Sequence, residues 1–169
     1  SSNSVYQYSL STANDLSTAS YDSVSFSVSS QTTAPSGVFF KSDGTKMYIG
    51  ELAGSNAVYQ YSLSTAWDIS TASYDSVSFS RTSQSSTNIN IFFKPDGTKM
   101  YSAAQNAVAV LEYGLSTAWD ISTASYNGSL SISTEDANLY GLWFGNDGTE
   151  VFVTGLSNDK VFKYDLSTA

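Results

Sequence analysis

A repeat of about 52 residues runs through the whole chain and limits the folds that it can adopt. The segment VYQYSLSTA at 5–13 returns at 58–66, and the related segments VLEYGLSTA and VFKYDLSTA begin at Val110 and Val161. Repeats of this length are typical of arrays in which each repeat is one supersecondary unit. We therefore expect one domain over 1–169, with repeats 5–57, 58–109 and 110–160 and a C-terminal echo of the first strand at 161–169.

Each repeat has the pattern of four β-strands. The VYQYSL segment alternates, so that Tyr59, Tyr61 and Leu63 fall on one face, and the segment SYDSVSFS alternates in the same way. Continuously apolar runs such as IFF are typical of strands buried on both sides. An Asp-Gly pair after each such run predicts a hairpin turn rather than a catalytic carboxylate pair. These turn residues are Asp43, Gly44, Asp96, Gly97, Asp147 and Gly148. The predicted fold class is all-β.

The order of these segments resembles the YVTN type of β-propeller repeat, a relative of the WD repeat. The resemblance rests on the segments FFKSDGTKMYIG at Phe39, FFKPDGTKMYSA at Phe92 and WFGNDGTEVFVT at Trp143, together with the VYQYSLS segments. It implies propeller blades in which the run before Asp-Gly is the innermost strand, A. The run after it is strand B, VYQYSLS is strand C and SYDSVSFS is the outermost strand, D.

The connection between strands C and D, LSTAWDISTASY, is long and rich in Ser and Thr, unlike that of the family. Asp15, Asp68 and Asp120 recur in it, and we expect them to accept hydrogen bonds from nearby backbone N–H groups. Trp67 and Trp119 also recur there and are predicted to pack between blades.

The strand order predicts assembly with a second chain. Along the chain come strands C and D of one blade, then two complete blades of four strands, and then strands A, B and C of a last blade. Three blades are too few for a closed ring of about 4–8 and would leave strand edges open. We expect a head-to-tail homodimer with six blades, with a nine-bladed homotrimer as the alternative. Either 5–10 or 161–166 supplies strand C at the joint. The joint residues are Val5, Tyr6, Tyr8, Leu10, Val24, Phe26, Val161, Phe162, Tyr164 and Leu166.

Composition excludes several kinds of site. The chain has no His and no Cys, so it lacks the residues of a serine–histidine triad, a thiol nucleophile or a zinc finger. Its net charge of −8 argues against a nucleic-acid partner. No apolar run approaches the ~18 residues of a membrane-spanning helix, so no membrane insertion is expected. No motif implies a cofactor or a metal.

The loops differ between repeats on one side of the expected ring. The D–A loops (31–37, 83–90 and 133–140) and the B–C loops (50–56, 103–107 and 154–159) vary, whereas the other connections are nearly repeated. The resemblance places ligands on this D–A/B–C face. A polar rim is predicted there from Glu51, Arg81, Gln84, Gln105, Glu135, Asp136 and Asp159. Free divergence of loops on which nothing packs is the alternative.

We interpret the chain as a non-enzymatic scaffold or recognition module whose first partner is itself, with a glycan or a protein as a further ligand. One alternative is a lectin with a weak site in each blade. The other is a hydrolase of the lactonase or glycosidase kind with carboxylates at the channel mouth. With 34 Ser and 16 Thr, the surface resembles that of propeller arrays in extracellular, cell-surface or phage-tail proteins.

Overall fold

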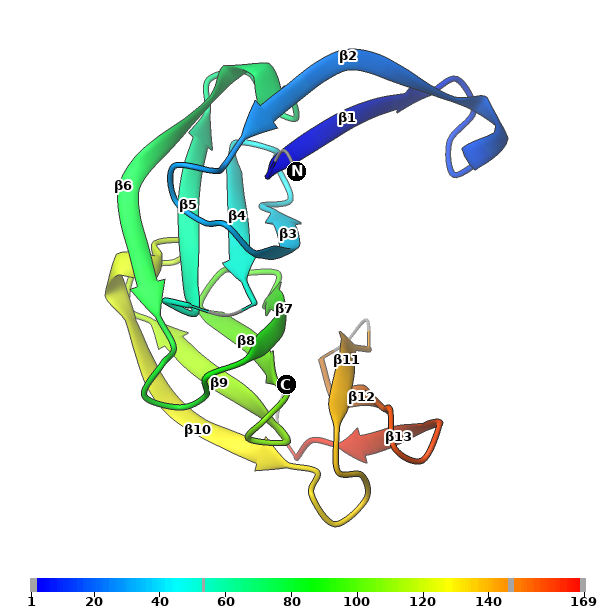
Figure 1. Ribbon diagram of the computed structural model, residues 1–169, viewed down its shortest axis with the longest axis vertical. Coiled ribbons are helices and arrows are strands. Elements are labelled where there is room, and N and C mark those ends of the chain that lie inside the picture. The colour runs from blue at the N-terminus through cyan, green and yellow to red at the C-terminus, as the bar shows by residue number, and fades with distance from the viewer. Residues whose placement is uncertain (1–2, 53, 146–147, 168–169) are drawn as a thin grey trace.

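The chain folds into antiparallel β-sheets that follow one another around an open arc (Figure 1). This fold is a computed structural model, which describes residues 3–52, 54–145 and 148–167. Its units are the N-terminal hairpin, β1–β2, the four-stranded sheet 1, β3–β6, the four-stranded sheet 2, β7–β10, and the three-stranded sheet 3, β11–β13. The prediction of an all-β fold with four-stranded antiparallel units is confirmed.

The strand bounds follow the repeat. The N-terminal hairpin is β1 (Ser4–Leu10) and β2 (Ala19–Ser27). Sheet 1 is β3 (Pro35–Phe40), β4 (Lys46–Glu51), β5 (Ala57–Leu63) and β6 (Ala72–Ser80). Sheet 2 is β7 (Asn88–Phe93), β8 (Lys99–Ala104), β9 (Ala109–Leu115) and β10 (Ala124–Ser131). Sheet 3 is β11 (Leu139–Phe144), β12 (Glu150–Gly155) and β13 (Lys160–Asp165).

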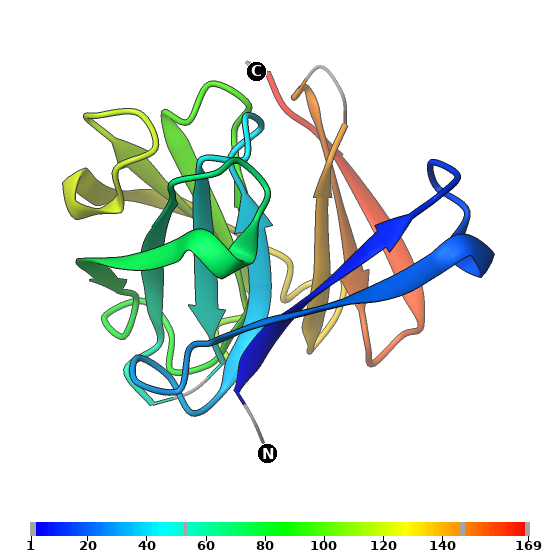
Figure 2. The same cartoon turned by 90° about the horizontal axis from the view of Figure 1, so that it is seen from above.

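The strands take the same places in each sheet. The strands β3, β7 and β11 lie on the inner side of the arc, and β2, β6 and β10 lie on its outer side (Figure 1). In the view from above, the inner strands of sheets 1 and 3 run along the axis of the arc (Figure 2). The N-terminal hairpin and β13 both border its open side (Figure 1). Among the described residues, no helix is long and apolar enough to cross a membrane.

A short 3₁₀ helix interrupts each connection between the third and the fourth strand. These helices are η1 (Leu16–Thr18), η2 (Ile69–Thr71) and η3 (Ile121–Thr123). Asp15, Asp68 and Asp120 cap them by accepting a hydrogen bond from the backbone N–H two residues on, which confirms the role expected for these carboxylates.

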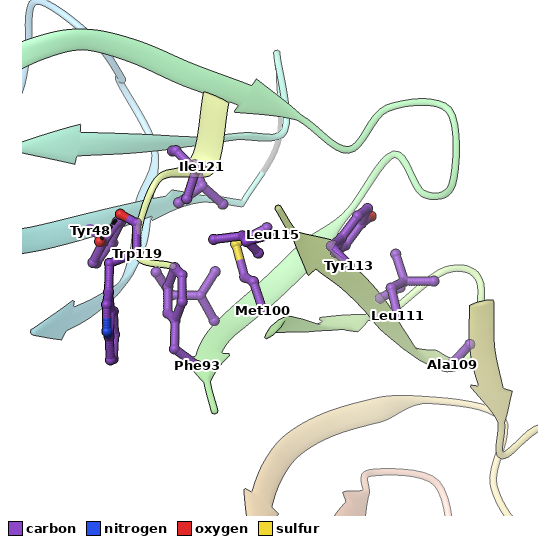
Figure 3. Close-up of a cluster of buried hydrophobic side chains, with 12 residues drawn as sticks. Tyr48, Phe93, Met100, Ala109, Leu111, Tyr113, Leu115, Trp119 and Ile121 are labelled. Carbon is purple, nitrogen blue, oxygen red and sulfur yellow. Dashed lines mark hydrogen bonds between the residues drawn. The ribbon is translucent and has the colours of Figure 1, made fainter. Parts of the chain in front are cut away.

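The core lies at the junctions between neighbouring sheets, where each connection folds back on the unit before it. Trp119 stacks on Phe93 of its own sheet and lies beside Tyr48 of sheet 1, whose hydroxyl donates to the Trp119 carbonyl at 2.5 Å (Figure 3). Ile121 is fully buried in the same cluster. Trp119 is 9% exposed, whereas Trp67 is 54% exposed, because the N-terminal hairpin offers no strand equivalent to β4.

The A–B turns adopt the backbone that glycine favours. Gly44, Gly97 and Gly148 have φ values of 73°, 75° and 72°, in the left-handed region. Asp43 and Asp96 accept a hydrogen bond from the threonine N–H two residues on. Asp147, the third predicted turn carboxylate, lies outside the described residues.

Candidate functional site

The variable loops of each sheet are tied together in pairs at one face. Leu52 donates its N–H to the carbonyl of Ala34 at 3.0 Å, and Leu156 does the same to Asn138 at 3.0 Å. The corresponding bond in sheet 2 joins Gln105 N–H to the Thr87 carbonyl at 2.9 Å. The D–A and B–C loops therefore form three similar platforms, which carry the residues predicted for a binding rim.

The platform of sheet 3 brings Glu135, Asp136 and Asp159 into one loop pair. Asp136 is buried and accepts hydrogen bonds from the N–H groups of Asn138, Ser157 and Asn158 at 2.8, 3.1 and 2.8 Å. Burial alone would raise the pKa of Asp136, but these backbone donors outweigh it and lower that pKa. The Asp136 carboxylate thus holds the two loops together, while Asp159 is exposed.

Arg81 lies inside the junction between sheets 1 and 2. It is fully buried and donates to the carbonyls of Asn56 at 2.9 Å, Glu51 at 3.0 Å and Ala57 at 3.3 Å, and to the Ser102 hydroxyl at 2.6 Å. Burial lowers its pKa to about 10, so the guanidinium stays charged at neutral pH. The structure therefore encloses Arg81 instead of presenting it at the rim.

The two predicted glutamines are half-buried. Gln84 Oε1 lies 3.5 Å from the Tyr113 hydroxyl. Gln105 is held by the hydrogen bond from its backbone N–H to the Thr87 carbonyl. Both therefore line the loop platform of sheet 2.

Glu51 is the centre of a polar cluster at the platform of sheet 1, which we call the Glu51 cluster: Thr32, Glu51, Ser55 and Tyr59. The Glu51 side chain is 5% exposed and accepts hydrogen bonds from the hydroxyls of Thr32, at 2.9 Å, and of Ser55. The Ser55 oxygen lies 2.9 Å from the Tyr59 hydroxyl, and Ser55 is an exposed residue. The hydroxyl of an exposed serine is thus held between a buried carboxylate and a phenol.

This arrangement has the elements of acyl-transfer chemistry. A hydroxyl that is hydrogen-bonded to a base can act as a nucleophile, and Glu51 is the base that contacts Ser55. Burial raises the pKa of Tyr59, which keeps its phenol protonated and able to donate to a developing oxyanion. No group of three or more His, Cys, Asp or Glu side chains that could hold a metal occurs in the described ranges.

The sequence places Glu51 in the predicted ligand-binding rim but does not point to Ser55, Tyr59 or Thr32. A signal was present, because Glu51 stands where the other two sheets have Ala104 and Gly155. Thr32 and Ser55 lie in two different loops and Tyr59 lies in β5, and only the fold brings their hydroxyls to the carboxylate.

A cavity of about 340 Å³ lies elsewhere, at the junction between sheets 2 and 3. Sheet 2 contributes Lys99, Tyr101 and Glu112 to its wall, and sheet 3 contributes Phe144 and Val151. Lys99 pairs with Glu112 at 3.1 Å. Burial, followed by the nearby carboxylates of Glu112 and Asp96, raises the pKa of Tyr101 to about 12, so its phenol remains protonated.

No protein-family model and no curated protein matches this chain. Solved structures do match. A proposed 6-phosphogluconolactonase of Bacteroides fragilis is 13% identical with a TM-score of 0.66, over 96% of this chain and 44% of that one. The periplasmic gluconolactonase of Pseudomonas aeruginosa is 14% identical with a TM-score of 0.60, over 78% and 36%. The β-propeller domain of Swd1 from Myceliophteria thermophila is 13% identical with a TM-score of 0.55, over 78% and 39%.

The fold is that of a β-propeller. The chain spans less than half the length of each of these structures. The prediction of a chain without enzymatic activity is contradicted, because propellers that share this fold are described as lactonases. That prediction rests on the unusual Ser/Thr-rich connection between strands C and D and on the absence of His. The absence of His removes one type of catalytic site and leaves carboxylate and hydroxyl chemistry open.

Proposed function

We propose that this chain is a lactonase-like hydrolase built as half of a six-bladed propeller, with the Glu51 cluster as its catalytic site. The proposal is carried by the hydrogen bond from the hydroxyl of the exposed residue Ser55 to the buried Glu51 carboxylate. Two propellers of similar fold are described as lactonases, and this supports a cyclic sugar ester as the substrate class. The cluster forms within one chain, so the chemistry does not depend on ring closure.

The proposed reaction proceeds in two balanced steps. Ser55 Oγ attacks the lactone carbonyl carbon while Glu51 takes the hydroxyl proton, and Tyr59 donates to the oxyanion. The ring C–O bond then breaks, and Glu51 returns the proton to the leaving ring oxygen, which leaves an ester on Ser55. Water, deprotonated by Glu51, attacks that ester and releases the open hydroxy acid, and the proton returns to Ser55.

Ring closure is proposed from surfaces that stay open in the single chain. We assign YVTN-type blades to the repeats 5–57, 58–109 and 110–160, and the sheet 3 strands A, B and C to a blade that the hairpin of a second chain completes. Tyr6 and Tyr8 of the hairpin are 48% and 57% exposed, whereas their counterparts Tyr59 and Tyr61 in sheet 1 are 8% and 0% exposed. Two chains give six blades, within the usual range.

The hydrolase proposal is tested by following acid release from a panel of γ- and δ-lactones, including glucono-δ-lactone, with spontaneous hydrolysis subtracted. We expect turnover that falls at least about 100-fold in Ser55→Ala and in Glu51→Gln, because each removes one member of the nucleophile–base pair. The control is Ser133→Ala, at an exposed loop serine whose hydroxyl is hydrogen-bonded to the Ser131 hydroxyl.

Two outcomes would overturn the proposed site. One is a panel in which no lactone reacts above background. The other is turnover that Ser55→Ala leaves unchanged, which would place the chemistry away from the Glu51 cluster.

A further inference from the structure

Two junctions of the molecule are closed by a 3₁₀ turn from the unit that follows. The turn η2 of sheet 1 packs on the N-terminal hairpin, and η3 of sheet 2 packs on sheet 1. Ile69 and Ile121, the first residues of these turns, are 2% and 0% exposed. Their N–H groups donate to the side-chain oxygens of Gln7 and Gln60, both at 3.1 Å. An apolar plug and one hydrogen bond therefore define each closed junction.

The junction between sheets 2 and 3 has the same wall but holds no turn among the described residues. The cavity wall includes Tyr101 and Glu112, which stand where sheet 1 has Tyr48 and Gln60. It also includes Phe144 and Gly148, the counterparts of Phe93 and Gly97. The cavity is thus the place that a 3₁₀ turn fills at the other two junctions.

The wall of this cavity carries a glutamate–asparagine pair where the other two junctions have a glutamine–aspartate pair, and it too offers a hydrogen-bond acceptor. In the hairpin and in sheet 1 a glutamine amide donates to an aspartate, Gln7 to Asp22 at 3.0 Å and Gln60 to Asp75 at 2.9 Å. In sheet 2 the direction is reversed, and Asn127 donates to Glu112 Oε1 at 3.2 Å. Lys99 also pairs with Glu112 Oε1, at 3.1 Å. The carboxylate has a second oxygen, and a charged acceptor makes a stronger bond to an N–H than an amide oxygen does.

One turn of the same form has no surface to pack on within its own chain. The turn η1 has the aspartate cap of η2 and η3, with Asp15 accepting from the Ser17 N–H at 3.0 Å. Leu16 corresponds to Ile69 and Ile121, yet it is 82% exposed. Asn14 has a φ of 61°, close to the 67° of Trp67 and Trp119, so the backbone is already set for docking.

We infer that the turn Leu16–Thr18 of a second copy of this chain occupies the cavity between sheets 2 and 3. Leu16 fills its apolar part, and the Leu16 N–H donates to Glu112. This inference rests on the proposed pairing of two chains and specifies where they touch. Since Asn14 replaces the tryptophan of the other junctions, the space above Gly148 stays only partly filled in such a dimer.

The test measures the dimer dissociation constant by analytical ultracentrifugation, with circular dichroism to verify folding. Leu16→Asp should weaken the dimer at least about 100-fold, because it places a second carboxylate beside Glu112. Asn14→Trp should tighten it about 10-fold, because an indole fills the remaining space. Leu156→Asp, at an exposed leucine in the B–C loop of sheet 3, should leave the constant unchanged.

A crosslink gives an independent readout, since the chain has no cysteine of its own. The double variant Leu16→Cys and Leu130→Cys should form a covalent dimer on oxidation, because Leu130 lines the cavity. The control pair Leu16→Cys and Leu156→Cys should not.

The outcomes separate this inference from the ring proposal. A dimer that ignores Leu16→Asp and Asn14→Trp, and that forms no 16–130 crosslink, would overturn the docking of the turn and leave the ring standing. A chain that stays monomeric at every concentration would overturn both.

Discussion

Arg81 shows how one residue changes the chemistry of a junction. Val28 and Ile132 occupy the same place at the ends of β2 and β10, and both are fully buried. Ser102, which accepts from Arg81, stands where sheets 1 and 3 have Ile49 and Val153. A buried cation is tolerated here because three carbonyls and a hydroxyl replace its hydration.

Arg81→Ile should lower the free energy of unfolding by about 2–3 kcal/mol, because it leaves buried carbonyls and the Ser102 hydroxyl without a donor. Urea unfolding followed by circular dichroism measures this loss. The double variant Arg81→Ile and Ser102→Val, which copies Ile132 and Val153 at the junction between sheets 2 and 3, should recover part of it. A single variant as stable as the parent would show that the guanidinium does not hold this junction.

At the residue scale, the sequence predicts which loops carry unusual polar residues but not what those residues touch. Glu51 and Arg81 both stand out as departures from the repeat. Glu51 is a buried carboxylate bonded to the exposed residue Ser55, whereas Arg81 is an enclosed structural cation. Burial and hydrogen-bond partners depend on tertiary packing, which a comparison of repeats does not reveal.

We expect a single position to decide which strand completes sheet 3 in the proposed dimer. Gln7 of β1 accepts the N–H of Ile69 at 3.1 Å, whereas β13 carries Lys163 at the corresponding place. Lysine has no acceptor. We therefore expect the hairpin β1–β2 to stay intact and to displace β13. Lys163 of β13 forms ion pairs with Glu150 of β12 and with Asp165 of its own strand, and both pairs are exposed and weak.

Matched substitutions in the two competing strands distinguish these arrangements. Tyr8→Asp should weaken the dimer at least about 100-fold, because Tyr8 becomes a core residue like Tyr61, a loss of about 2.7 kcal/mol in binding free energy. Tyr164→Asp should leave the dimer intact. The reverse pattern, read from dissociation constants in a dilution series, would assign the joint to β13.

At the element scale, periodicity and the Asp-Gly pairs were sufficient to predict the strands and their order. The connection LSTAWDISTASY was predicted only as a connection with capping aspartates and packing tryptophans. Its 3₁₀ turn, and the fact that the turn packs on the preceding sheet, follow from contacts between units that share no local sequence signal.

At the scale of the whole molecule, the open arc leaves two ends that we expect to be complementary. One end exposes Trp67, Leu16 and the hairpin tyrosines, and the other offers the cavity and the unpaired edge of β13. Each Å² of apolar surface that is removed from water contributes about 25 cal/mol of favourable free energy, which favours joining such ends. A monomer would keep both ends in water, at a cost in solubility.

The most direct test of this account is the solution mass from light scattering on a sizing column, across a dilution series. A six-bladed ring of two chains predicts a species of about twice 18.1 kDa that dissociates on dilution, with the fluorescence of Trp67 shifting to longer wavelength as the joint opens. A monomer of 18.1 kDa at every concentration, or a stable trimer, would contradict the six-bladed ring.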